Sequence, residues 1–92
     1  MKSERGRGGI VEDIVYRRVL MKEIAGQCIQ VTLNYAKGLK PTNVTATPLF
    51  RNILLEDIHC QRAQSSYFID GLAEQHVQNL TLSTRPWLHF IF

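Results

Sequence analysis

The chain has 92 residues, of which 45% are hydrophobic and 21% charged, so it is long enough for one small domain and too apolar for a disordered segment. The net charge of +3 is modest. No run approaches the roughly 20 apolar residues of a membrane span, and the polar start lacks the apolar core of a secretory signal. We therefore expect no membrane partner, and a protein that is either intracellular or begins upstream of Met1.

The first residues, MKSERGRGG, combine Lys2, Arg5 and Arg7 with glycines directly before a β-branched run. They are compatible with a disordered basic arm, a phosphate or RNA element, or the edge of a larger active site. RNA-binding RGG units recur and are interleaved with aromatic residues, whereas this unit occurs once. The segment also lacks the glycine spacing of known phosphate loops. We expect no nucleic-acid partner.

The next segment, VEDIVYRRVLMKEI, has an apolar spacing that fits neither a helix nor a plain strand. Its apolar residues are separated by 3, 2, 3, 2 and 3 positions: Val11, Ile14, Tyr16, Val19, Met21 and Ile24. On a helix they would scatter around the circumference, and a plain strand would require a spacing of two throughout. Short strands joined by one-residue corners would keep all six side chains on one side.

The same spacing recurs in two further segments, with partial copies starting at Phe50 and Val77. Asp13, Asn52 and Asn79 hold the same place in the three copies, just before a branched or leucine side chain. Asp and Asn tolerate the left-handed backbone of a corner, and stacked copies could hydrogen-bond to one another. The Gly-, Pro-, Asn- and Thr-rich stretch at about 34–48 predicts a loop inserted between the first two copies.

A repeat of this kind predicts an all-β fold, a parallel β-helix of about three incomplete coils in which each coil covers the next. We expect one partial domain over residues 1–92: a basic Gly-rich edge at 1–8, coils at 9–84 and an aberrant tail at 85–92. A small antiparallel sandwich is the alternative, but it requires tight hairpins. The Asp70-Gly71 pair is not followed at once by a partner strand.

Three stretches resemble the C-terminal coils of polygalacturonases, the pectin-hydrolysing enzymes of glycoside hydrolase family 28. They are RGRGGIVEDIVYRRVLMKEIAGQCIQVTLNY, TPLFRNILLEDIHC and SSYFIDGLAEQHVQNLTL. The resemblance covers roughly residues 2–84. It implies a right-handed, pectin-lyase-like solenoid, a secreted parent enzyme that acts in cell-wall carbohydrate metabolism, and an acidic polysaccharide as the partner. No cofactor and no obligate protein partner are expected.

The resemblance also implies two substrate-binding residues. The family has an Arg-apolar-Lys signature whose cations bind the galacturonate carboxylate, and Met1-Lys2 matches its last two places. A tyrosine lines the same cleft at the end of a later strand, where Tyr35 ends IQVTLNY. We therefore assign Lys2 and Tyr35 to polysaccharide binding.

The catalytic aspartates of the family lie in N-T-D, D-D and G-H-G motifs, none of which occurs in this chain. Glycoside hydrolysis generally needs two such carboxyl groups. We expect a polygalacturonase fragment that is inactive by itself. The alternatives are a catalytically dead module that binds pectin and a different β-helix protein, such as an adhesin; endo or exo action stays open.

The cysteines and sequons complete the candidate sites. Cys28 and Cys60 are too few for a disulfide scaffold, and their redox state is left open. His59-Cys60 has no second ligand pair at a suitable spacing, so no metal site is expected. Of two N-glycosylation sequons, Asn43 lies in the expected loop and is the candidate acceptor, whereas Asn79 belongs to the repeat.

Overall fold

The computed structural model describes residues 1–41, 43–85 and 88–91 and contains one four-stranded sheet in the order β1-β2-β3-β4. The strands are β1 (Ile10–Thr32), β2 (Leu49–Asp70), β3 (Gln78–Arg85) and β4 (Leu88–Ile91), and a 3-10 turn, η1, spans Val44–Ala46. β1, β2 and β3 are parallel, and β4 is antiparallel to β3. The fold is all-β, and the parallel order makes the antiparallel sandwich alternative wrong.

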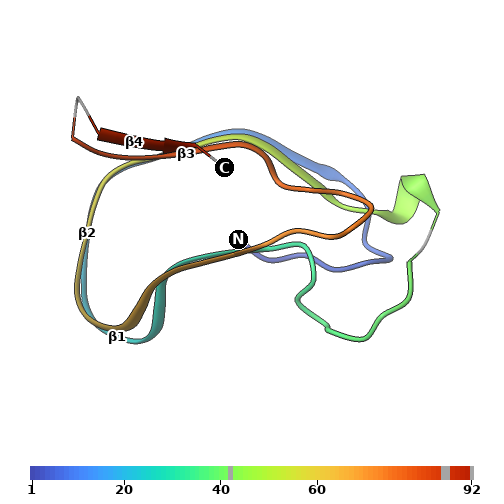
Figure 1. Ribbon diagram of the computed structural model, residues 1–92, viewed down its shortest axis with the longest axis horizontal. Helices are drawn as coiled ribbons and strands as arrows, with labels where there is room; N and C mark the ends of the chain where they lie inside the picture. Colours follow the sequence, from blue (N-terminus) through green and yellow to red (C-terminus); the bar gives the residue numbers. More distant parts are fainter. Residues whose placement is uncertain (42, 86–87, 92) are drawn as a thin grey trace.

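The sheet is curled rather than flat (Figure 1). β1 and β2 run along one arm, turn at one end of the molecule and return along a second arm, following nearly the same outline. The connections lie at the opposite end, where the segment between β1 and β2 contains η1. The two arms therefore face each other across an interior.

The register between the strands matches the repeat found in the sequence. Val11 of β1 pairs with Phe50 of β2, and Ile14 pairs with Ile53, which in turn pairs with Leu80 of β3. The copies that start at Val11, Phe50 and Val77 therefore stack side by side. Parallel neighbours with matching apolar residues bury one another's inner faces.

The three-residue gaps in the apolar pattern are corners with left-handed backbone. In β1, Asp13, Arg18 and Glu23 have φ angles of 58°, 54° and 54°. The corresponding residues in β2 and β3 are left-handed as well: Asn52, Asp57, Arg62 and Asn79. Each corner turns the strand and returns the next apolar side chain to the interior, which confirms the strand–corner–strand interpretation.

The first corner forms the polar ladder that the sequence predicts. Asn79 Nδ2 donates to Asn52 Oδ1 at 3.0 Å, and Asn52 Nδ2 donates to Asp13 Oδ1 at 3.3 Å. At the third corner, Glu23 of β1 forms an ion pair with Arg62 of β2, whereas Asp57 at the second corner of β2 contacts His59. Because these groups are exposed, they are expected to set the register more than the stability.

The core lies in the interior, between the two arms of the sheet. Its buried members come from β1, β2, β3 and the connections: Val31, Leu33, Phe50, Ile53, Leu55, Leu72 and Leu80. Burial falls toward β1, whose outer edge pairs only with residues 1–3 within the described chain. Val11 and Tyr16 are 37% and 45% exposed, so the expected one-sided apolar row of β1 lies at the rim and is only partly covered.

Cys28 and Cys60 form a disulfide with a Cα–Cα distance of 6.1 Å. Cys60 lies in β2 opposite Met21, whereas Cys28 lies in the returning arm of β1, after the register shift between Ile24 and Gln27. The bond therefore crosses the curl and ties the second arm of β1 to β2. Neither cysteine within the described residues is free.

The C-terminal end differs from the repeat. β4 folds back on β3 and pairs Leu82 with Phe90 in antiparallel register, so β3 is covered along its outer side. The repeat did not predict this strand. Pro86, Trp87 and Phe92, which belong to the expected aberrant tail, lie outside the described residues. Among the residues that are described, no helix is long and apolar enough to cross a membrane.

Candidate functional site

Residues 1–3 form a short parallel segment on the outer edge of β1. Thr32 N donates to Met1 O at 3.1 Å and Ser3 N donates to Thr32 O at 2.9 Å, while Met1 N donates to Gln30 O at 2.8 Å. Strand pleating sends successive side chains to opposite faces. Met1 therefore packs against the core and Lys2 points outward.

The glycines that follow have a structural role. Gly6 N and Gly8 N both donate to Ala46 O, at 2.9 and 3.0 Å, which brings this segment against η1. Gly8 has a φ of +63°, and a Cβ atom there would lie 2.5 Å from the Thr45 carbonyl oxygen. Only glycine fits this close approach. The GRGG run is thus held against η1 rather than free, and it holds the first residues in place.

Arg5 fixes the same segment through an ion pair with Glu74. Its Nε and Nη2 donate to the two carboxylate oxygens of Glu74 at 2.6 and 2.7 Å, and its Nη1 donates to Leu39 O at 2.6 Å. The fork-shaped guanidinium suits such a two-bonded pair. The hydrogen bonds from Arg5 lower the pKa of Glu74 to about 2. Three segments distant in the sequence are thereby joined beside Lys2.

This pair predicts a pH dependence. Because the pKa of Glu74 is lower in the folded chain than its ordinary value of 4.5, the pair stabilises the fold above that value. The contribution should fall as the pH drops from about 4.5 to about 2. Thermal unfolding of the wild type and of Glu74→Gln should differ at pH 7 and converge at pH 2; a constant difference would contradict the assignment.

Lys2 and Tyr35, the two predicted binding residues, lie together. Lys2 Nζ is 4.6 Å from the centroid of the Tyr35 ring, and Tyr35 N donates to Ser3 O at 2.9 Å. Both side chains are exposed, Tyr35 to 57%. The ammonium group lies over the ring within the range of a cation–π interaction, which holds it against one face of the ring. What they bind stays a prediction.

A shallow groove of about 240 Å³ adjoins Tyr35. It is lined by outward side chains at the end of β1, by residues of the following loop and by one aromatic residue of β2: Gln27, Gln30, Thr32, Asn34, Tyr35, Lys37 and Phe68. Amide groups, a hydroxyl, a cation and two aromatic rings suit a ligand that has both polar groups and apolar faces, such as a sugar. Sequence reasoning missed this groove, because β1 and β2 bring its residues together only in the folded chain.

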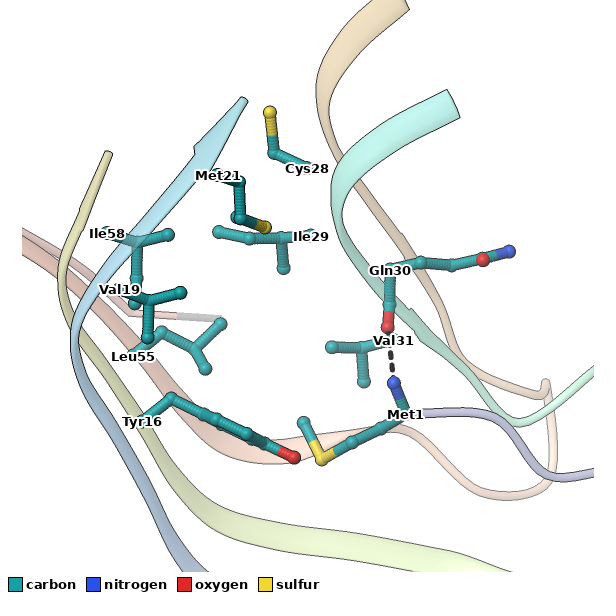
Figure 2. A pocket seen from close by; sticks show the side chains of 10 residues that line it. All are labelled: Met1, Tyr16, Val19, Met21, Cys28, Ile29, Gln30, Val31, Leu55 and Ile58. Atoms are coloured by element: carbon teal, nitrogen blue, oxygen red, sulfur yellow. Dashed lines mark hydrogen bonds between the residues drawn. The ribbon is translucent and has the colours of Figure 1, made fainter. Parts of the chain in front are cut away.

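A second hollow lies on the inner side of the sheet (Figure 2). Its lining is mainly apolar, including Tyr16, Val19, Met21, Val31 and Leu55, with Met1 at its side. Tyr16, Val19, Met21 and Leu55 are repeat positions, and their inner faces are left partly open beside β1. This hollow of about 220 Å³ is part of the incompletely packed rim, and the groove at Tyr35 is the candidate site.

The remaining candidates do not line the groove. Asn43 is exposed, and its Oδ1 accepts hydrogen bonds from Thr45 Oγ1 at 2.7 Å and from Ala46 N at 3.1 Å, so glycosylation there stays a prediction. His59 contacts Asp57, and Cys60 is in the disulfide. No group of metal-ligating side chains occurs in the described part of the chain.

Comparisons with known proteins add no assignment: no family model matches the chain, and neither a curated protein nor a solved structure matches it.

Proposed function

We propose that this chain is part of a parallel β-helix of the polygalacturonase kind and that its Lys2–Tyr35 edge binds an acidic polysaccharide such as polygalacturonate. The contact between Lys2 and Tyr35 carries the proposal. The sequence resemblance assigned these two residues to one cleft, and Lys2 Nζ lies 4.6 Å from the centroid of the Tyr35 ring.

The curled parallel sheet supports the β-helix part of the proposal. Three copies of one apolar pattern stack in register, and their first corners share a side-chain ladder from Asp13 to Asn79. Such stacking is the organising feature of solenoids, in which each repeat contacts its neighbours. A right-handed β-helix continues this geometry through whole coils.

The chemistry of the edge supports an anionic sugar as the ligand. A lysine ammonium group binds a carboxylate through a charge-assisted hydrogen bond. The face of the Tyr35 ring carries partial negative charge and attracts the C–H groups of a pyranose ring. In the described residues no carboxylate is ion-paired with Lys2, so its charge is available to a ligand.

The proposal separates binding from catalysis. The parent activity is the inverting hydrolysis of α-1,4-galacturonosyl bonds, which needs an acid and a base. Asp13 belongs to the corner ladder and Asp57 contacts His59, and neither lines the groove. We expect residues 1–92 to bind without hydrolysing. The disulfide agrees with a secreted protein, because disulfides persist in oxidising compartments.

The test is calorimetric titration of the chain with a galacturonate oligomer, with a neutral glucan oligomer as the control ligand. Lys2→Gln should weaken binding up to about fivefold and Tyr35→Ala up to about tenfold. Lys22→Gln, which removes an exposed lysine elsewhere on β1, should leave binding unchanged. Absence of binding by the wild type, or equal losses for Lys2→Gln and Lys22→Gln, would refute the proposed function.

The second candidate is a module that binds pectin and has no catalytic parent. Cys28–Cys60 and the Arg5–Glu74 pair favour it, because both links lie within residues 1–92 and hold segments next to the binding edge. Reducing-sugar release from polygalacturonate distinguishes hydrolysis from binding. Release by the chain itself would refute our expectation that it binds only.

A further inference from the structure

We propose a second carboxylate-binding position in the groove beside Tyr35, formed by Lys37 over Phe68, so that the edge recognises two uronate units of one chain. The inference rests on the proposed function, because it extends the Lys2–Tyr35 position along the same ligand. It assigns a role to a lysine and an aromatic residue that the sequence did not single out.

The first observation is a second cation–aromatic pair at the same groove. Lys37 Nζ lies 5.8 Å from the centroid of the Phe68 ring, close to the outer limit for a cation–π interaction. Tyr35, which contacts Lys2, and Phe68 both line the groove. The groove therefore has one lysine held near each of its two aromatic rings.

The second observation concerns charge. Lys37 is exposed and, within the described residues, has no carboxylate partner, as is also true of Lys2. Arg5 differs, because Glu74 neutralises it. Two unpaired cations beside one groove attract a ligand with two negative charges more strongly than one with a single charge.

The third observation concerns the polar groups that line the groove. Gln30 and Asn34 present amide groups that both donate and accept hydrogen bonds. A sugar hydroxyl group uses both a donor and an acceptor, whereas a fully ionised anion uses only donors. A polymer of uronate units supplies hydroxyls, apolar ring faces and regularly repeated carboxylates, and it fits the lining better than phosphate would.

One anionic group lies close to this arrangement. The register pairs Thr32, which lines the groove, with Asp70, so their side chains share the outer face of the sheet. A carboxylate there repels an anionic ligand. We expect Asp70→Asn to strengthen the binding of uronate oligomers, which gives the proposal a variant with a gain of binding.

The test compares galacturonate monomer, dimer and trimer by titration at low and high salt. The wild type should bind the galacturonate dimer more tightly than the monomer, and this difference in affinity should be smaller at high salt. Lys37→Gln should reduce the dimer-to-monomer affinity ratio up to about fivefold, while Lys37→Arg keeps most of it. Lys22→Gln is the matched control, and circular dichroism checks that each variant is folded.

The outcomes separate the two proposals. If no uronate binds, the proposed function fails and this inference fails with it. If Lys2→Gln weakens binding of monomer and dimer while Lys37→Gln leaves the dimer-to-monomer ratio unchanged, only the second position is refuted. A ratio that falls in Lys37→Gln and rises in Asp70→Asn supports it. Equal binding of inorganic phosphate and of the dimer would also overturn it, since the hydroxyl contacts would then contribute nothing.

Discussion

Replacing Cys28 and Cys60 together with alanine is expected to lower the free energy of unfolding by about 3–4 kcal/mol. The disulfide links residues 32 positions apart and restricts the unfolded chain accordingly. A chain of this size has a total stability of roughly 5–14 kcal/mol. Thermal unfolding should show a decrease of roughly 15–25 °C in Tm.

Reduction of the wild type provides the control for this prediction. The reduced wild type and the double alanine variant should unfold at similar temperatures, and the variant should not respond to a reductant. Equal Tm values for the oxidised and reduced wild type would show that the bond does not stabilise the curl. If reduction strongly lowers the Tm of the wild type and also abolishes uronate binding, the second arm of β1, which carries Gln30 and Thr32, depends on the disulfide.

The strand core was predictable because its signal is local and repeated. The spacing from Val11 to Ile24 identifies short strands with corners, and the copies starting at Phe50 and Val77 give the register that the structure shows. Asp13 marked a corner because its residue type tolerates left-handed backbone. Arg18 and Glu23, which have the same backbone conformation, carried no such signal.

Other features depend on contacts between distant segments and could not be predicted. Cys28 and Cys60 approach each other only because β1 shifts register after Ile24 and returns along the second arm. The groove likewise requires Phe68 of β2 beside the loop residue Lys37. The sequence resemblance did select Lys2 and Tyr35, whose contact depends on residues 1–3 pairing with the end of β1.

Replacing Ile53 with alanine is expected to destabilise the fold by about 2–5 kcal/mol. Ile53 is 1% exposed and lies between Ile14 of β1 and Leu80 of β3 in the register. Removing its side chain leaves a cavity in the middle of a three-residue stack, which neither neighbour can fill without moving its strand. Chemical denaturation monitored by circular dichroism measures the loss.

The matched control is the same substitution at Ile10, which begins β1 and is 57% exposed. It should change stability by less than about 0.5 kcal/mol, because little apolar surface is buried there. Ile14→Ala should fall between the two, since Ile14 is half-buried beside the open edge of β1. This order tests the stacked core directly. In a curled sheet whose middle strand lies between two neighbours, the loss of stability should be larger in β2 than in β1. Similar losses at all three isoleucines would contradict the stacking on which both the β-helix and its binding edge depend.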